Sequence, residues 1–182
     1  MLDKFKFLSS LRSSPRGVSG GFAQARYEHF KCVLDDEHVS GLFCSAGQIF
    51  ARARVPDSVA EIFGLGRMTA LQKEQGGVRG IVTGDSFRRL IAKTLARQFS
   101  SEIEEACSPF QFALSTRAGT DCMGLCLRAR ADADPEAVIV SIDGVGAYDH
   151  ISREAMFRKL SSVPNASAIL PFVRLFYGRN SR

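Results

Sequence analysis

One aspartate, Asp143, has the surroundings that a metal ligand needs, and a second, Asp149, follows six residues later. Asp143 directly follows residues 137–142, an apolar run that predicts a buried β-strand. A carboxylate at the end of a strand has a rigid mount and an open side, and Mg²⁺ binds one or two such carboxylates together with substrate phosphates. A second interpretation stays open, in which Asp143 forms a turn and Asp149 caps a helix that begins near Ser152.

A lysine and an arginine on a predicted β-hairpin supply the complementary positive charge. Two short β-prone runs, 67–73 and 78–83, flank a turn that contains two glycines. With a two- or three-residue turn, Lys73 and Arg79 fall on adjacent strands, diagonal or directly opposite. Like charges in such positions destabilise a hairpin unless something negative lies between them. Glu74 is one candidate for that role, and a bound anion such as a triphosphate is the other.

The segment after the hairpin predicts an amphipathic helix with an apolar stripe and a basic stripe. Asp85 is placed to cap the N-terminus of this helix. The apolar stripe, at helical spacing, consists of Phe87, Leu90, Ile91, Leu95, Phe99 and Ile103. On another face of the helix, Arg89, Lys93 and Arg97 recur every fourth residue.

Basic residues are concentrated between Arg67 and Arg97. This segment holds seven Lys or Arg residues and two acidic ones, so its excess of five equals the net charge of +5 of the whole chain. Such a local excess favours phosphate, nucleic acid or a membrane surface as a partner. A solvated basic helix face explains the same charge without any partner, and charge alone does not separate the two interpretations.

The remaining segments predict an α+β fold with a helical N-terminal layer. Residues 1–21 are expected to be flexible, because their second half is rich in Ser, Pro and Gly. Helices are expected at about 37–54, near 118–131, and around 152–162 and 168–177. Helices combined with one hairpin and one core strand favour the α+β class.

Several kinds of site are not supported by the sequence. The five cysteines form an odd, irregularly spaced set without zinc-ligand spacing, so free buried thiols in a reducing compartment are expected. The three histidines are scattered, and no Ser or Cys has a catalytic base in a recognisable pattern. No apolar run approaches the length that spans a bilayer, which predicts a soluble, intracellular protein without a membrane partner.

Five sequence elements, taken in order, resemble the reverse transcriptases of non-LTR retrotransposons. The first is Gly20-Gly21-Phe22 followed by YEHFK at 27–31, similar to the glycine-containing, EHLK-like element of these polymerases. The second is LQKEQGGVRGI at 71–81, similar to the fingers hairpin LxKxxGGxRPI, and the third is FRRLIAK at 87–93, similar to RRLxxK. The fourth is FQFAL at 110–114 with AGTD at 118–121, similar to QFG…GT. The fifth is SIDGVGAYD at 141–149, similar to the first palm motif DxxxAFD or DxxxAYD.

The resemblance implies a fold and a set of site residues. It implies that residues 22–135 are the polymerase fingers and that 136–182 begin the palm, with an incomplete antiparallel palm sheet. Asp143 would be a catalytic, metal-binding aspartate, with the carbonyl of Gly144 beside it. Lys73 and Arg79 would hold the triphosphate of the incoming nucleotide. Tyr148 would stack under its sugar and exclude a 2′-hydroxyl, and Asp149 matches an acidic position that usually does not bind metal.

The chemistry implied by the resemblance is RNA-directed DNA synthesis. Two Mg²⁺ ions in the complete domain would activate the primer 3′-hydroxyl and hold the triphosphate. The partners would be an RNA template, a DNA primer and a dNTP, and the location would be the nucleus. Arg89, Lys93 and Arg97 would track the nucleic-acid backbone without sequence preference.

Three departures from the family pattern qualify this expectation. Gly80 stands where the family often has proline, and Ala113 where it often has glycine. No Asp-Asp pair follows Asp143 within the 182 residues, although the family draws its remaining metal carboxylates from such a pair. We therefore expect the chain alone to be catalytically inactive, marginally stable and prone to self-association. A non-catalytic, nucleic-acid-binding relic and a helical interaction protein with coincidental motifs are the alternatives.

Overall fold

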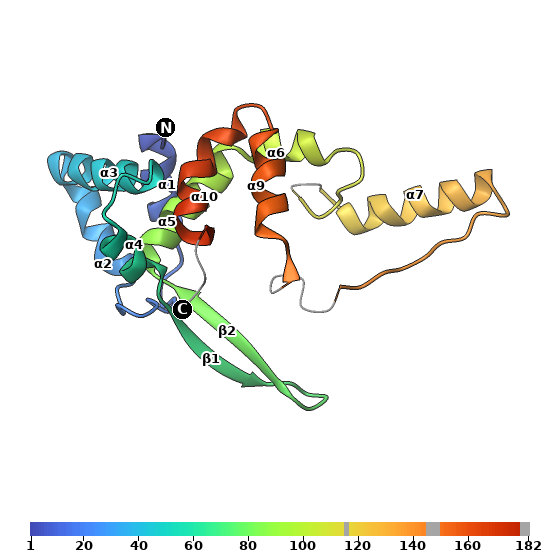
Figure 1. The fold of residues 1–182 in the computed structure, drawn as a ribbon, viewed down its shortest axis with the longest axis horizontal. Helices are drawn as coiled ribbons and strands as arrows, with labels where there is room; N and C mark the ends of the chain where they lie inside the picture. Colours follow the sequence, from blue (N-terminus) through green and yellow to red (C-terminus); the bar gives the residue numbers. More distant parts are fainter. Residues whose placement is uncertain (115–116, 145–149, 179–182) are drawn as a thin grey trace. The chain divides into compact units, whose positions relative to one another are not determined.

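The computed structural model describes residues 1–114, 117–144 and 150–178, and the chain divides into two compact units (Figure 1). The first unit comprises residues 1–99 together with the chain from residue 167 onward, and the second comprises residues 100–166. The positions of the two units relative to one another are not determined.

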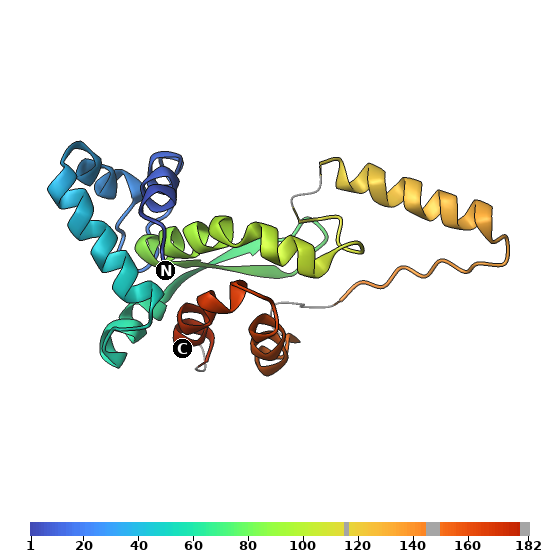
Figure 2. The same ribbon diagram turned by 90° about the horizontal axis from the view of Figure 1, so that it is seen from above.

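The first unit is a helical layer that carries one β-hairpin. Its helices are α1 (Lys4–Arg12), α2 (Tyr27–Lys31), η1 (Cys32–Asp35), α3 (Glu37–Ala51), α4 (Asp57–Gly64), α5 (Ser86–Gln98) and α10 (Leu170–Tyr177). Helix α5 packs against α1 and α3, and α10 packs against α3 and α4 (Figure 2). The helices begin where the sequence supplies a cap: side-chain oxygens of Asp3, Asp36 and Asp85 accept backbone N–H groups of α1, α3 and α5.

The core of the first unit joins α1 to α5. Phe7 and Leu11 of α1 and Leu90 and Ile91 of α5 are completely buried. This packing corrects the expectation that residues 1–21 are flexible throughout. The Ser-, Pro- and Gly-rich composition belongs to the second half of that segment, whereas α1 presents an apolar face at helical spacing that α5 covers.

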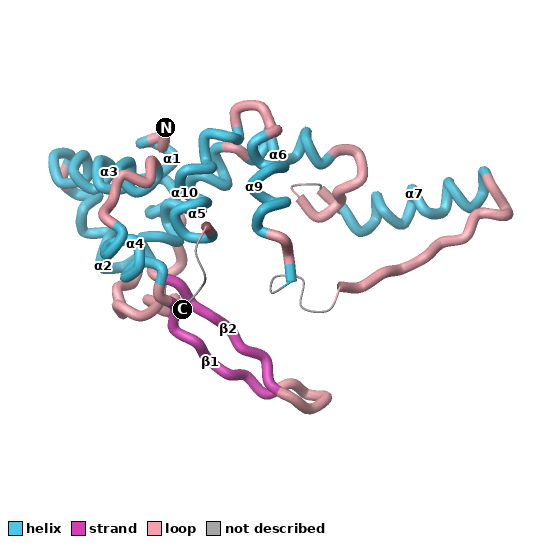
Figure 3. The backbone as a smooth tube through the Cα atoms, viewed as in Figure 1, coloured by secondary structure: helices cyan, strands magenta, loops and turns pink. Residues whose placement is uncertain are grey.

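The hairpin consists of β1 (Gly66–Gln72) and β2 (Val78–Gly84), which pair antiparallel from Gly66 opposite Gly84 to Gln72 opposite Val78. This confirms the predicted strands and turn. Figure 3, in which strands are magenta, shows the two strands extending away from the helices of the first unit. Almost every residue of both strands is exposed, so cross-strand pairs rather than burial hold the hairpin together.

The second unit contains the helices α6 (Ser100–Cys107), α7 (Gly119–Ala133) and α9 (Arg153–Ser161), and η2 (Ala166–Ile169) begins at its end. None of the described side chains of α6, α7 and α9 is buried.

The helices expected near 118–131, 152–162 and 168–177 are present as α7, α9 and α10. The apolar stripe predicted for a single helix is divided, because α5 ends at Gln98 and Ile103 lies on α6.

The prediction of a buried strand at 137–142 is wrong. Residues 137–144 form no helix or strand, and Val138 and Ile142 are 85% and 89% exposed. A strand needs a hydrogen-bonded neighbour. In the described part of the chain β1 and β2 pair only with each other, and the one backbone hydrogen bond of this segment is local, from Ala137 N to Asp134 O.

The fold class is nevertheless α+β, as predicted. The described residues combine helices with one two-stranded antiparallel sheet.

Candidate nucleotide and nucleic-acid interface

The hairpin register brings Lys73 and Arg79 onto one face. Arg79 lies opposite Leu71, and the N–H of Lys73 donates to the Gly77 carbonyl at 3.0 Å. Since residues two apart on a strand share a face, Lys73 lies diagonal to Arg79, at the usual Cα separation of about 7–8 Å. The sequence predicted a diagonal or a directly opposite pair, and the diagonal arrangement is the one present.

Neither basic side chain is neutralised within the hairpin. Lys73, Glu74 and Arg79 are exposed, and in the described residues none of the three makes a side-chain hydrogen bond or an ion pair. Glu74 therefore does not act as the counter-charge that one interpretation assigned to it. The two like charges of Lys73 and Arg79 are therefore open to solvent.

The basic stripe of α5 points toward α1 and the loop that follows it. Lys93 Nζ donates to Ser14 Oγ at 3.2 Å and to Ser10 O at 3.4 Å. Arg97 Nη1 lies 3.2 Å from Ser13 Oγ. Lys93 is half-buried and Arg97 is exposed, so both remain open to solvent on one side.

Arg88 and Arg89, the paired arginines of the RRLxxK-like segment, hold the first unit together. The Arg88 guanidinium lies over the Phe176 ring of α10, with 4.3 Å between Cζ and the ring centroid. Arg89 donates to the Ser19 carbonyl and lies over the Tyr27 ring at 5.5 Å. The structure thus gives Arg89 internal partners, as it does Lys93 and Arg97.

The glycine-containing element near Gly21 meets the hairpin at the start of α5. Gly21 has φ +71°, and a Cβ there would lie 2.6 Å from the Gly84 carbonyl oxygen. Only glycine accommodates both the left-handed backbone and this close approach. Together with the contacts of Arg89 to Ser19 and Tyr27, this contact brings the glycine-containing element and the RRLxxK-like segment together at the N-terminal end of α5.

Asp143 and Gly144 lie in the second unit, on the exposed segment that follows α7. The structure therefore does not define how far Asp143 is from Lys73 and Arg79. Tyr148 and Asp149 fall outside the described residues. The cap of α9 is Ser152, whose Oγ accepts the Ala155 N–H at 3.2 Å, in place of the cap proposed for Asp149.

The described residues do not assemble a magnesium site. Across 1–114, 117–144 and 150–178, no group of three or more His, Cys, Asp or Glu side chains is arranged to hold a metal ion. A two-metal centre needs several carboxylates around it, and Asp143 is the one candidate of the palm motif that the structure describes. We therefore assign no metal-dependent step to this arrangement.

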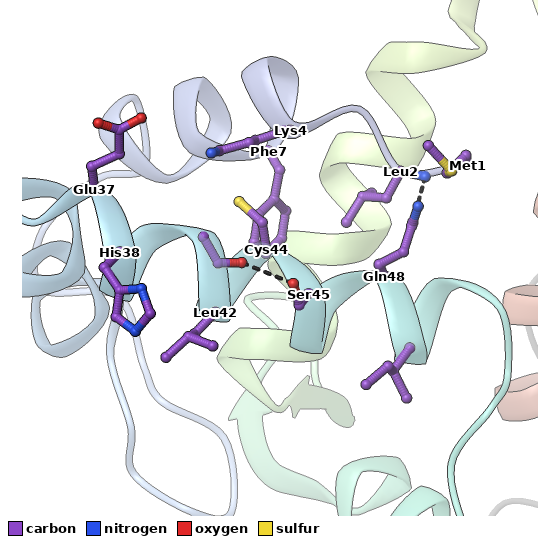
Figure 4. Close-up of a pocket in the computed structure, with 12 residues that line it drawn as sticks. Met1, Leu2, Lys4, Phe7, Glu37, His38, Leu42, Cys44, Ser45 and Gln48 are labelled. Carbon is purple, nitrogen blue, oxygen red and sulfur yellow. Dashed lines mark hydrogen bonds between the residues drawn. The ribbon is translucent and has the colours of Figure 1, made fainter.

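A groove of the first unit is separate from all of these residues. It lies between α1 and α3, has a volume of about 660 Å³ and combines apolar side chains with Lys4, Glu37 and His38 (Figure 4). Cys44 also lines it, and burial raises the pKa of the Cys44 thiol, so this thiol is not an activated nucleophile. All five cysteines are free, as predicted, but none is fully buried.

Two residues that contribute to the basic surface of α5, Lys31 and Ser14, were not predicted from the sequence. Lys31 Nζ donates to the Ser14 carbonyl at 2.8 Å, which places it beside Lys93. Lys31 and Lys93 are far apart in sequence, and no periodicity relates them. Ser14 belonged to a segment assigned to a flexible loop, although it is buried against α5.

Comparison with known proteins identifies no family for this chain. A scan against protein-family models, a search of curated proteins and a search of solved structures each found no match. None of the helices in the described residues is both long and apolar enough to cross a bilayer.

Proposed function

We propose that this chain is the nucleotide- and nucleic-acid-binding front portion of an RNA-directed DNA polymerase of the non-LTR retrotransposon type. The observation that carries the proposal is the exposed diagonal pair of Lys73 and Arg79 on the hairpin. The ordered resemblance of five elements supports it, and two of these elements, the glycine-containing one and the RRLxxK-like one, meet around the N-terminal end of α5.

The pair of basic residues suits a triphosphate better than a lone phosphate. Arg79 can grip two oxygens of one phosphate through parallel hydrogen bonds, and Lys73 supplies a flexible point charge for the next. Both side chains are long and flexible, so both can reach one triphosphate across their diagonal separation. The exposed hairpin gives the ligand access from solvent.

A titration of the 182-residue chain with dTTP tests this proposal. Arg79→Gln should weaken dTTP binding roughly fivefold, the loss expected for one exposed charge pair of about 1 kcal/mol. Arg67→Gln is the matched control: it lies on the same face of the hairpin, but six residues along the strand place it about 20 Å from Lys73. Thymidine lacks phosphates, so we expect it not to bind at the Lys73–Arg79 pair. Equal losses for Arg67→Gln and Arg79→Gln would contradict a specific triphosphate site.

A non-catalytic nucleic-acid-binding protein is the second candidate function. The specific observation in its favour is that Asp143 lies on an exposed, unpaired segment, and no described carboxylates join it. For the 182-residue chain we expect nucleic-acid binding without extension of a primer. Magnesium-dependent DNA synthesis on an RNA template by the purified chain would overturn this expectation, whereas Asp143→Ala should leave binding unchanged.

A further inference from the structure

Three basic side chains from two helices converge on the C-terminal end of α1. Lys31 of α2 donates to the Ser14 carbonyl at 2.8 Å. Lys93 of α5 donates to Ser14 Oγ and to the Ser10 carbonyl. Arg97, one helical turn further along α5, lies within 3.4 Å of Ser10 Oγ and 3.2 Å of Ser13 Oγ. We call these three basic residues, with Ser13 and Ser14, the α1 cation cluster.

The oxygens that Lys31 and Lys93 contact in this cluster are neutral. Both are serine oxygens or backbone carbonyls at a helix C-terminus. A helix C-terminus carries only about half a negative charge, which is less than the charge of either lysine. Lys31 and Lys93 therefore keep positive charge that these oxygens do not balance.

The electrostatic surroundings of Lys93 show the same imbalance. Burial and then the neighbouring charges of Arg97 and Lys31 lower the pKa of the Lys93 ammonium. Its charged neighbours are thus cations, which repel it. A bound anion would remove this repulsion, since one negative group between several cations favours all of their charged forms.

The cluster is also accessible and carries suitable hydrogen-bond donors. Ser13 and Arg97 are exposed, and Lys31 and Lys93 are half-buried. The hydroxyl of Ser13 can turn from the Ser10 carbonyl, at 3.3 Å, toward a ligand. Ammonium groups, a guanidinium fork and a serine hydroxyl are the donors that proteins commonly direct at phosphate oxygens.

We propose that the α1 cation cluster binds a phosphate group of a nucleic-acid backbone. This inference rests on the proposed function, because it places a nucleic-acid strand along the face of α5 that lies toward α1. The cluster is separate from the Lys73–Arg79 pair, which lies at the turn end of the hairpin. The hairpin would thus contact the nucleotide, and α5 would contact the nucleic-acid strand.

A purely structural role is the competing explanation, in which the cations only cap the last carbonyls of α1. Capping alone predicts that substitution lowers stability but that added phosphate has no specific effect. The first test therefore uses the unmodified 182-residue chain. Inorganic pyrophosphate, compared with chloride at equal ionic strength, should raise the thermal midpoint by about 3 °C at roughly ten times its Kd. No difference between the two salts would overturn the proposal.

Variants locate the site. Lys93→Gln and, separately, Lys31→Gln should each abolish most of the pyrophosphate-dependent shift. Lys6→Gln makes the same charge change on the exposed side of α1 and should keep the full shift. If Lys93→Gln does not fold, Lys31→Gln tests the same site from α2. A shift that survives both Lys31→Gln and Lys93→Gln would overturn the assignment to this cluster.

Binding of a single-stranded oligo(dT) tests whether the α1 cation cluster contacts a nucleic-acid strand or only a free phosphate compound. For a strand contact, Lys93→Gln should reduce the slope of log K against log salt by about 0.7, the value for one phosphate of a single strand. Lys6→Gln should leave the slope unchanged. An unchanged slope in Lys93→Gln, with tight oligo(dT) binding, would overturn the strand contact and leave the proposed function standing. A chain that binds pyrophosphate but no oligo(dT) would contradict the proposed function instead.

Discussion

Phe87 is the residue on which the packing of the first unit depends most. Its ring lies between 5.2 and 6.3 Å, centroid to centroid, from the rings of Phe7, Phe30, Phe43, Phe50 and Phe63. These rings come from α1 to α4, so Phe87 connects α5 to each of these helices. Most of the contacts are edge-to-face, the arrangement that aromatic pairs prefer.

Removing this ring should therefore destabilise the first unit strongly. We expect Phe87→Ala to lower the free energy of unfolding by about 3–5 kcal/mol, the usual cost of removing a buried aromatic side chain. Urea titration followed by circular dichroism measures the change. Phe5→Ala, at a position 86% exposed on α1, is the matched control and should change stability by less than about 0.5 kcal/mol. Similar losses for both variants would show that Phe87 is not the centre of the core.

At the scale of elements, the hairpin depends on its turn more than on burial. Gly76 and Gly77 have φ of +88° and +87°, a conformation that strains any residue with a Cβ. The turn also fixes the register and therefore the diagonal placement of Lys73 and Arg79. An exposed two-stranded hairpin is only marginally stable, so strain in the turn has a large effect on its population.

Gly77→Ala should therefore disrupt the hairpin and weaken dTTP binding together. The strain costs roughly 1 kcal/mol, enough to open a marginal hairpin in a large share of molecules. Cross-strand NMR contacts between residues 71 and 79 report the hairpin directly. Gly64→Ala, at the end of α4 in open space and without positive φ, should leave both unchanged. Intact cross-strand contacts in Gly77→Ala would contradict the dependence on the turn.

The sequence predicted the hairpin and α5 because their signals are local. The Gly76-Gly77 turn between β-prone runs, the Asp85 cap and the apolar spacing from Phe87 to Leu95 all act within a few residues. These features were predictable from the sequence alone. The sequence left the placement of Lys73 and Arg79 open between diagonal and directly opposite, because it did not fix the length of the turn.

The failures came from interactions between distant residues. The run 137–142 has a strand composition, but a strand forms only with a partner, and composition does not show whether one is present. Helix α1 was missed because its burial depends on α5, far along the chain. Lys31 joined the α1 cation cluster only through tertiary packing, so no spacing rule would have identified it.

The exposed apolar run should promote self-association. Val138, Ile139, Val140 and Ile142 are exposed within a segment that has free backbone hydrogen-bonding groups. We expect Val140→Lys to shift the chain toward monomer in sedimentation velocity at micromolar concentration. Phe5→Lys introduces the same charge at another exposed apolar residue and should have a smaller effect. Equal shifts for the two variants would indicate a general effect of charge rather than pairing of this segment.

At the scale of the whole molecule, the residues proposed for binding and for catalysis are divided between the two units. The hairpin pair and the α1 cation cluster belong to the first unit, and Asp143 belongs to the second. The first unit has a buried aromatic core, whereas the helices α6, α7 and α9 have no buried described side chain. We therefore propose that the well-packed first unit recognises phosphate, and we expect this recognition to be independent of Asp143.

The most direct test of the proposed function is the binding of an RNA template annealed to a DNA primer, measured by fluorescence anisotropy at several salt concentrations. We expect binding without sequence preference, with log K falling linearly as log salt rises. We also expect that Lys93→Gln weakens this binding while Asp143→Ala and Lys6→Gln do not. No binding at low salt, or binding that is independent of salt, would contradict the claim that this chain recognises nucleic acid through its phosphates.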